Sequence, residues 1–237
     1  MMKLCDKYSL NARIYPSIVF LLPCIMLAIF YVPNIESYYQ KFSYLGLLGV
    51  LFVLLAHWGR ENGKKKESEL FRHWGGKPTS LVLRHSNDYF MAHIKKIFHK
   101  KLEQKIPSVK IPTAEEECVD LRAADEIYDS CARYLISKTR NTKKYRLLFD
   151  ENINYGFRRN LWGLKRYGIC ITVVCIFTHI FILMHKYSSD EAIIIKDLIF
   201  LAALVVCVIC WISIVNKEWV KTTAFAYAER LYETLHE

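Results

Sequence analysis

The stretch LIFLAALVVCVICWISIVN, residues 198–216, runs for 19 residues without an Asp, Glu, Lys or Arg. Three more windows share this property, residues 14–35, 42–59 and 167–185. Each is close to the roughly 20 residues that an α-helix needs to cross a bilayer. A soluble chain of 237 residues could not bury four helices that are apolar on every face, because soluble helices normally carry a single apolar stripe. The windows therefore predict four transmembrane helices.

The first window, residues 14–35, could instead be a cleaved signal peptide. Pro16 and Pro23 lie inside it, and no small-residue cleavage site precedes the polar segment that follows. These features favour a segment that is retained as a span.

Positive residues lie mainly between the second and third windows. Residues 60–166 hold 24 Lys and Arg against 14 Asp and Glu, a net charge of +10 that equals the charge of the whole chain. Residues 1–13 are also net positive, whereas the two short connectors between spans are not. By the positive-inside rule the basic segments face the cytoplasm. We therefore expect a multi-pass protein of the cell inner (plasma) membrane with cytoplasmic N- and C-termini.

This layout predicts an all-α integral membrane protein, with four transmembrane helices in two hairpins and a helical cytoplasmic domain. Two long helices are expected to leave the bilayer without a break, over residues 143–183 and 198–235. The predicted parts are a cytoplasmic N-terminus (1–13), transmembrane hairpin 1 (14–59), a cytoplasmic helical domain (60–165), transmembrane hairpin 2 (166–216) and a C-terminal helix that packs on the central domain (217–237).

The central domain is expected to contain an amphipathic helix from about residue 88 to 105 and another from Thr113 to Lys138, which opens on a capping-box pattern. Cys118, Leu121, Tyr128, Cys131 and Leu135 mark the predicted buried side of the second helix. The outer face of the first helix carries Lys95, Lys96, His99, Lys100 and Lys101. The acidic residues of the second helix are its simplest partner.

The segment FRHWGGKPTS, residues 71–80, has a glycine pair followed by a lysine. It is not a P-loop, because the spacing differs and Pro78 removes a backbone N–H where one is needed. Two readings remain: an anion-binding turn that presents glycine amides, or an interfacial turn anchored by Trp74. The predicted anion- or ligand-binding residues are Arg72, Gly75, Gly76, Lys77, Arg84, His85, Arg158 and Arg159.

Other residues are predicted to meet the membrane. Aromatic and basic side chains favour the headgroup region, which indicates an interfacial position for Trp58, Lys64, Lys65, Lys66 and Trp162. A histidine at membrane depth is costly, so His179 is expected to face a pore or the bundle interior. The pair Cys207 and Cys210 is interpreted as packing in an apolar run.

The sequence offers no recognisable catalytic constellation. His73, His85, His93 and His99 lack a carboxylate partner at metal-ligand spacing, and no nucleophile–base arrangement stands out. We therefore predict no catalytic residues, no metal and no cofactor. The basic runs are interpreted as membrane contacts, and direct nucleic-acid binding is not expected.

Several motifs together resemble a known group of proteins. These are WGGKPT (74–79), LRH (83–85), PTAE (112–115) and ENINYGFRRNL (151–161). They resemble motifs of a bacterial group of four-span membrane proteins of unassigned function. The layout also resembles the membrane components of anti-phage defence systems, in which a cytoplasmic part receives a signal and the spans sense or perturb the membrane.

Two hypotheses for function follow. The first is a non-enzymatic membrane sensor or effector, which couples a cytoplasmic ligand or protein partner to the transmembrane helices. The alternative is a membrane-bound enzyme that acts on lipid or nucleotide headgroups at the cytoplasmic interface. The expected partners are membrane lipids, further copies of the chain in a homo-oligomer, and either a cytosolic protein or an anionic nucleotide ligand.

Overall fold

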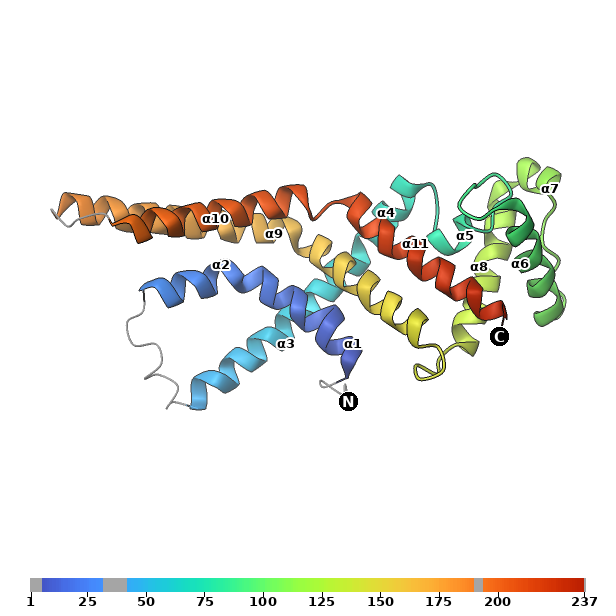
Figure 1. The fold of residues 1–237 in the computed structure, drawn as a ribbon, viewed down its shortest axis with the longest axis horizontal. Helices are drawn as coiled ribbons and strands as arrows, with labels where there is room; N and C mark the ends of the chain where they lie inside the picture. The colour runs from blue at the N-terminus through green and yellow to red at the C-terminus, as the bar shows by residue number, and fades with distance from the viewer. Residues whose placement is uncertain (1–5, 32–41, 190–193, 237) are drawn as a thin grey trace. The chain divides into compact units, whose positions relative to one another are not determined.

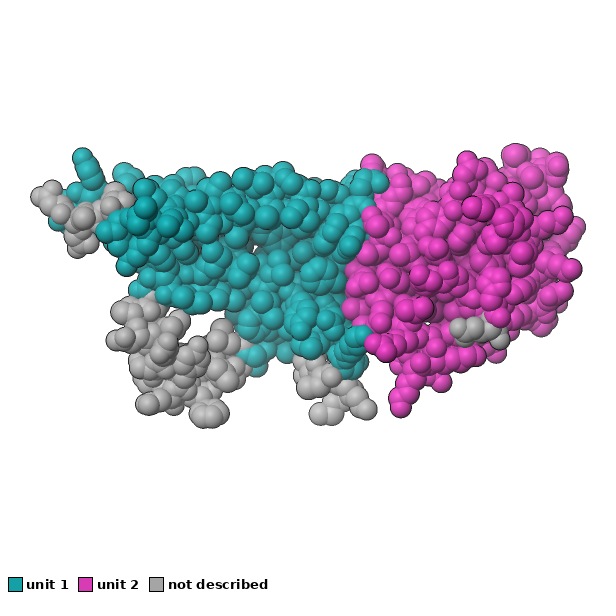
Figure 2. Space-filling view, viewed as in Figure 1, with its two compact units in different colours: residues 1–66, 156–220 teal, residues 67–155, 221–237 magenta. Residues whose placement is uncertain are grey.

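The computed structural model describes residues 6–31, 42–189 and 194–236, except for the side chains of residues 42–48. Within these residues every regular element is a helix and none is a strand, which confirms the all-helical prediction (Figure 1). The chain divides into two compact units (Figure 2). Unit 1 holds Met1–Lys66 and Gly156–Val220, and unit 2 holds Glu67–Tyr155 and Lys221–Glu237.

Unit 1 contains the apolar helices. Its elements are α1 (Lys7–Ser9), a π-helical turn (Leu10–Ile14), α2 (Tyr15–Tyr31), α3 (Phe42–Lys65), the larger part of α9 (Arg146–Ser188), α10 (Ile195–Ser213) and the start of α11 (Lys217–Glu233). Three helical stretches are long and apolar enough to cross a membrane: Lys7–Tyr31, Arg146–Ser188 and Ile195–Ser213. The predicted span over residues 42–59 lies in α3, which is not among the three. Part of it, residues 42–48, lies outside the residues with described side chains, so four spans stay a prediction.

Two glycines allow α3 and α9 to approach closely within unit 1. A Cβ atom on Gly163 would lie 2.5 Å from the backbone nitrogen of Gly63. Contacts below about 3 Å of this kind are not tolerated, because a backbone cannot move aside as a side-chain tip can. Elsewhere in the unit, Phe200 of α10 stacks on Phe30 of α2 with ring centroids 4.3 Å apart.

The predicted helix over residues 143–183 is confirmed by α9, but the predicted unbroken helix over residues 198–235 is wrong. The chain leaves the helix after Ser213 and begins α11 at Lys217. The backbone N–H of Trp219 donates to Asn216 Oδ1 at 2.9 Å, an N-cap interaction that favours a new helix start. Lys165 Nζ also donates to the Val215 carbonyl at 2.7 Å, which satisfies an acceptor in the break.

Unit 2 is a small helical domain with its own core. It contains α4 (Glu67–Trp74), α5 (Pro78–Leu81), α6 (Ala92–Lys105), α7 (Ala114–Val119), α8 (Leu121–Lys138), the first ten residues of α9, most of α11 and a 3₁₀ turn (Thr234–His236). Fully buried side chains from α6, α8 and α11 form the core: Phe98, Leu102, Tyr128, Leu231 and Tyr232. The Tyr232 hydroxyl donates to the Thr79 carbonyl at 2.7 Å, so α11 is tied to the segment that follows the glycine pair.

The buried side predicted for a single helix over Thr113–Lys138 is partly wrong, because this stretch forms two helices, α7 and α8. Tyr128, Cys131 and Leu135 are buried, but Cys118 and Leu121 are exposed. The reason is a break at Asp120, whose side chain accepts from the backbone N–H of Ala123 at 2.9 Å and begins a new helix. The helical phase therefore changes between α7 and α8, and residues before the break no longer share a face with residues after it.

Candidate functional site

The segment that contains the glycine pair forms one wall of an open cleft in unit 2. The opposite wall is the first half of α8, and the cavity volume is about 730 Å³. The lining residues are Ser68, Phe71, Arg72, Gly75, Gly76, Lys77 and Ser80 on one side and Leu121, Arg122, Asp125, Glu126 and Asp129 on the other. Four of the predicted ligand-binding residues thus line a real cavity.

The glycine pair ends α4. Gly75 has a φ of 87°, a left-handed conformation that glycine adopts without steric cost and that commonly closes helices. The Gly76 N–H donates to the Phe71 carbonyl at 2.8 Å, and the Gly75 N–H to the Arg72 carbonyl at 3.4 Å. Both amides are therefore used inside the turn, whereas an anion-binding turn would direct them at the ligand.

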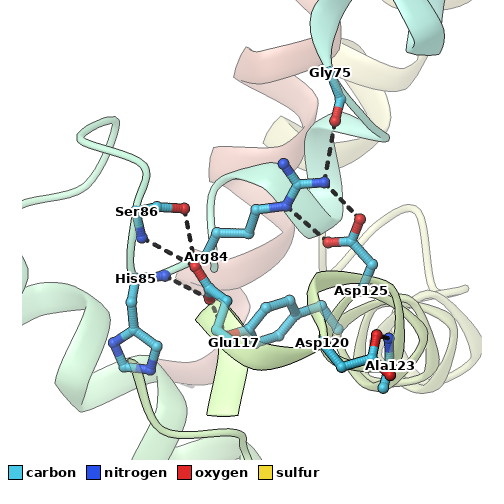
Figure 3. Close-up of polar contacts among 9 residues, drawn as sticks. Gly75, Arg84, His85, Ser86, Glu117, Asp120, Ala123 and Asp125 are labelled. Carbon is cyan, nitrogen blue, oxygen red and sulfur yellow. Dashed lines mark hydrogen bonds and ion pairs between the residues drawn. The ribbon is translucent and has the colours of Figure 1, made fainter. Parts of the chain in front are cut away.

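Arg84 ties this turn to α8 (Figure 3). Its Nε donates to Asp125 Oδ1 at 2.8 Å and its Nη2 to Asp125 Oδ2 at 2.5 Å, while Nη2 also donates to the Gly75 carbonyl at 3.0 Å. This is the two-pronged geometry that makes arginine–carboxylate pairs strong. The hydrogen bond to Asp125 raises the pKa of Arg84. The Arg84 side chain is only 12% exposed, so its charge is largely committed to Asp125.

Lys77 makes a second link between the turn and α8. Its Nζ lies 2.8 Å from Asp129 Oδ1, and Arg133 Nε donates to the same carboxylate at 2.9 Å. Burial alone would raise the pKa of Asp129, but the hydrogen bonds from Lys77 and Arg133 outweigh it and the pKa is lowered. Two of the predicted anion-binding cations are thus paired with carboxylates of α8.

Glu117 holds the segment that follows Arg84. Its carboxylate accepts from the backbone N–H groups of His85 at 2.8 Å and Ser86 at 3.1 Å, from Ser86 Oγ at 2.9 Å and from the Tyr128 hydroxyl at 2.8 Å (Figure 3). Burial raises the pKa of Glu117, yet these donors outweigh it and the net shift is downward. Burial and the hydrogen bond to Glu117 together raise the pKa of Tyr128. Nothing local in the sequence indicates this role, because Glu117 is one of three consecutive glutamates at a predicted helix start.

Lys95 and His99 were predicted on the outer face of α6, and this is wrong. Lys95 is 5% exposed and His99 is 8% exposed. Lys95 Nζ donates to the carbonyls of Arg84, His85 and Asn87, and His99 Nε2 lies 2.8 Å from the Leu83 carbonyl. Burial lowers the pKa of both groups. The loop after α5 leaves several carbonyls without helical partners, and α6 supplies the donors that they need.

The remaining predicted ligand-binding residues do not line the cleft. His85 places Nε2 3.0 Å from the Pro112 carbonyl. Arg158 and Arg159 belong to unit 1. Arg158 Nη1 donates to the Trp219 carbonyl at 2.7 Å, and Arg159 is 7% exposed and bonds to Asn160 Oδ1. The structure therefore assigns these three side chains to contacts within their own units.

His179 lies in a buried polar cluster of unit 1. It is fully buried, with Nδ1 2.5 Å from the Tyr31 hydroxyl and Nε2 3.0 Å from the Asp197 carbonyl. Asp197, also fully buried, lies 3.3 Å from Lys186 Nζ. The rings of Phe30 and Phe200 cover the imidazole. Sequence reasoning missed Asp197, since it lies one residue before the uncharged window.

Two of the predicted interfacial residues contact each other in unit 1. Lys66 Nζ lies 5.2 Å from the centre of the Trp162 ring and donates to the Gly163 carbonyl at 3.3 Å. Trp58 packs its ring against Phe20 and Tyr167. The role of these residues at lipid headgroups stays a prediction, as it does for Lys64 and Lys65.

The described part of the chain contains no group of three His, Cys, Asp or Glu side chains placed to hold a metal ion. The chain matches no family model, no curated protein and no solved structure. The cavity is lined by three carboxylates of α8, Asp125, Glu126 and Asp129, and by three cations, Arg72 and Lys77 on the opposite wall and Arg122 on α8 itself; apolar side chains complete the lining.

Proposed function

We propose that the protein is a non-enzymatic membrane sensor or effector whose unit 2 binds a cytosolic protein partner in the cleft between the glycine turn (residues 71–80) and α8. The observation that carries this proposal is the pairing of Lys77 with Asp129 and of Arg84 with Asp125. The pairing leaves a cleft of balanced charge. A polypeptide segment with mixed charges and apolar side chains suits such a surface better than a phosphate, which needs uncompensated cations and free amides.

The connection to the membrane helices in this proposal is α9. This helix has 43 residues, and a rise of 1.5 Å per residue makes it about 65 Å long. About 20 residues are enough to cross the hydrocarbon core, so roughly half of α9 remains for the cytoplasmic side. Residues 146–155 of α9 belong to unit 2 and residues 156–188 to unit 1. A shift of unit 2 on binding would reach the spans as a rigid-body movement of one helix.

Site-specific photocrosslinking in cells tests the binding step. A photoreactive amino acid at Leu121, which lines the cleft, is compared with the same amino acid at Ile136 on α8. Both side chains are similarly exposed, at 44% and 43%, but only Leu121 is a cleft residue. We expect a discrete protein adduct from position 121 that is absent from position 136. Reversal of a cleft charge with Glu126→Lys should weaken the adduct.

Three outcomes would count against a protein partner. One is no adduct at position 121, and another is equal adducts at both positions. The third is binding of a nucleotide to the purified protein that is lost in Lys77→Ala, which would replace the polypeptide by an anionic ligand.

The effector step is tested by membrane potential. Expression of the wild-type chain should depolarise cells, whereas Asn154→Pro should not, because proline in a helix interior costs about 3 kcal/mol or more and kinks the helix. Matching expression levels and unchanged hydrogen exchange in α8 and α10 would show that the variant has kept both units. Equal depolarisation by the two proteins would refute transmission through α9.

We propose that the protein acts in defence against phage, because its layout resembles that of the membrane components of anti-phage systems. Cells with and without the protein are challenged with a phage panel, and a reduced plating efficiency is expected for at least one phage. Equal plating across the panel would remove this setting and leave the binding proposal in place.

A further inference from the structure

The outer face of α6 is basic with an apolar centre. His93, Lys96, Ile97 and Lys100 follow one another at the spacing of a single helix face, and all four are exposed. Ile97 is 40% exposed, and Met91 at the start of the helix is 71% exposed. Among the described residues Lys96 and Lys100 have no carboxylate within ion-pair distance. This face, which we call the α6 stripe, comprises His93, Lys96, Ile97 and Lys100.

A second groove in unit 2 has the opposite charge. It lies along α7 and the start of α8 and has a cavity volume of about 550 Å³. Val119, 88% exposed, Ala123 and Ile127 supply apolar surface, and Glu115, Glu116 and Asp120 line the same groove. Lys110 is the one cation among its lining residues. We call this the α7–α8 groove; it is separate from the cleft beside the glycine turn.

The two surfaces do not neutralise each other within the chain. The sequence predicted that the acidic residues of α8 pair with the basic helix α6, and this is wrong for the residues that the structure describes. Asp129 pairs instead with Lys77 of the glycine turn, and Asp125 with Arg84, which follows α5. The α6 stripe and the α7–α8 groove are thus left as complementary surfaces, one net positive and one net negative, each with exposed apolar side chains at its centre.

We propose that the α6 stripe of one copy of this chain docks in the α7–α8 groove of a second copy. Lys96 and Lys100 are one helical turn apart on the stripe, and Glu115, Glu116 and Asp120 supply the opposite charge in the groove. Ile97 supplies the apolar side chain for the surface around Val119. A second copy is the occupant because each chain carries both halves of the pair. When two copies face each other across a two-fold axis, the contact is made twice.

This interaction does not depend on a protein partner in the other cleft, so it can be tested on the full-length protein alone. The first variant is Lys96→Glu with Lys100→Glu, which reverses the stripe. The second is Glu115→Lys with Val119→Lys, which reverses the groove at positions with the same spacing. The control is Arg140→Glu with Lys143→Glu, which changes the net charge as much as the first variant at exposed positions outside both surfaces.

The measurement is the mass of each protein in detergent by size exclusion with light scattering, across a concentration series. We expect the wild-type and control proteins to associate, and more weakly at high salt because exposed charges are screened. Each reversed variant should associate on the order of ten-fold or more weakly, since like charges then face each other. Co-expression of the two reversed variants should restore association between them.

Restoration by co-expression identifies a folded, complementary pair even if one variant alone is unstable. A monomeric wild-type protein would overturn the proposal. So would an unchanged mass in both reversed variants, or a failure of the co-expressed variants to associate with each other.

Discussion

Replacement of Glu117 by alanine should open the loop that connects the glycine turn to α6. In the folded protein this carboxylate accepts hydrogen bonds from the N–H groups of His85 and Ser86, from Ser86 Oγ and from the Tyr128 hydroxyl. It is 3% exposed, and Tyr128 is fully buried. The substitution therefore removes the acceptor that fixes residues 85–86 against α8.

The free-energy cost of Glu117→Ala depends on which of the four donors water can reach after the substitution. The Tyr128 hydroxyl is left without an acceptor in a buried place, which costs about 1–3 kcal/mol. His85 and Ser86 are exposed residues, so water replaces part of what their donors lose, and we add about 1 kcal/mol for the two together. The total is about 2–4 kcal/mol, which corresponds to roughly 30- to 700-fold in an opening equilibrium.

Hydrogen exchange with mass spectrometry on the full-length protein in detergent measures this effect locally. Peptides that cover residues 81–90 and 121–135 should exchange faster by about that factor. The matched control is Glu116→Ala, which removes a neighbouring carboxylate of the capping box and should cost about 1 kcal/mol, confined to α7.

A second substitution tests whether the Tyr128 hydroxyl, left without its acceptor, causes the faster exchange. Tyr128→Phe, added to Glu117→Ala, removes the stranded hydroxyl and should slow exchange again by roughly ten-fold or more. Wild-type exchange rates in Glu117→Ala, or no recovery in the double variant, would refute the role that we give to Glu117.

Three further predictions follow from the same contacts. The pKa of Glu117 is lowered from its ordinary 4.5, so the carboxylate stabilises the fold at neutral pH and this stabilisation is lost as pH falls below about 4.5. The thermal midpoint of Glu117→Gln should therefore fall less steeply with acid than that of the wild-type protein. Parallel plots of midpoint against pH for the two proteins would contradict this. Asn216→Ala removes the N-cap of α11 and should destabilise that helix start by about 1 kcal/mol, seen as faster exchange at residues 217–220; an unchanged rate there would count against the cap. Gly163→Ala forces α3 and α9 apart at Gly63 and should lower the free energy of unfolding by about 1–3 kcal/mol. Gly49→Ala, with open space around it, should not destabilise the protein, because alanine favours a helix over glycine; equal thermal midpoints for the two variants would contradict the close crossing.

The sequence predicted the helices well because apolar windows and capping patterns are local signals. The start of α11 can also be predicted from the sequence, because an asparagine before a charged first turn is an N-cap signal. The apolar pattern continues in phase across Asn216, however, and this pattern alone predicts one unbroken helix.

The candidate site was less accessible to sequence reasoning. Arg84 and Asp125 are 41 residues apart in the chain, and nothing local indicates that they meet. The glycine turn suggested free amides and cations, whereas folding uses the amides to end α4 and places carboxylates of α8 beside the cations. Helical periodicity alone predicts an exposed Lys95. In the structure its ammonium group is buried, because it donates hydrogen bonds to loop carbonyls at Arg84, His85 and Asn87.

The distance along α9 tests most directly the central claim that one rigid helix joins unit 2 to the predicted spans. Spin labels are placed at Leu147 and Arg166, both exposed, in a chain whose native cysteines are replaced, diluted with unlabelled protein. Nineteen residues of unbroken helix correspond to about 28 Å. We expect a single narrow distribution near this value that broadens in Asn154→Pro. A broad or two-peaked distribution in the otherwise unaltered chain would contradict the claim.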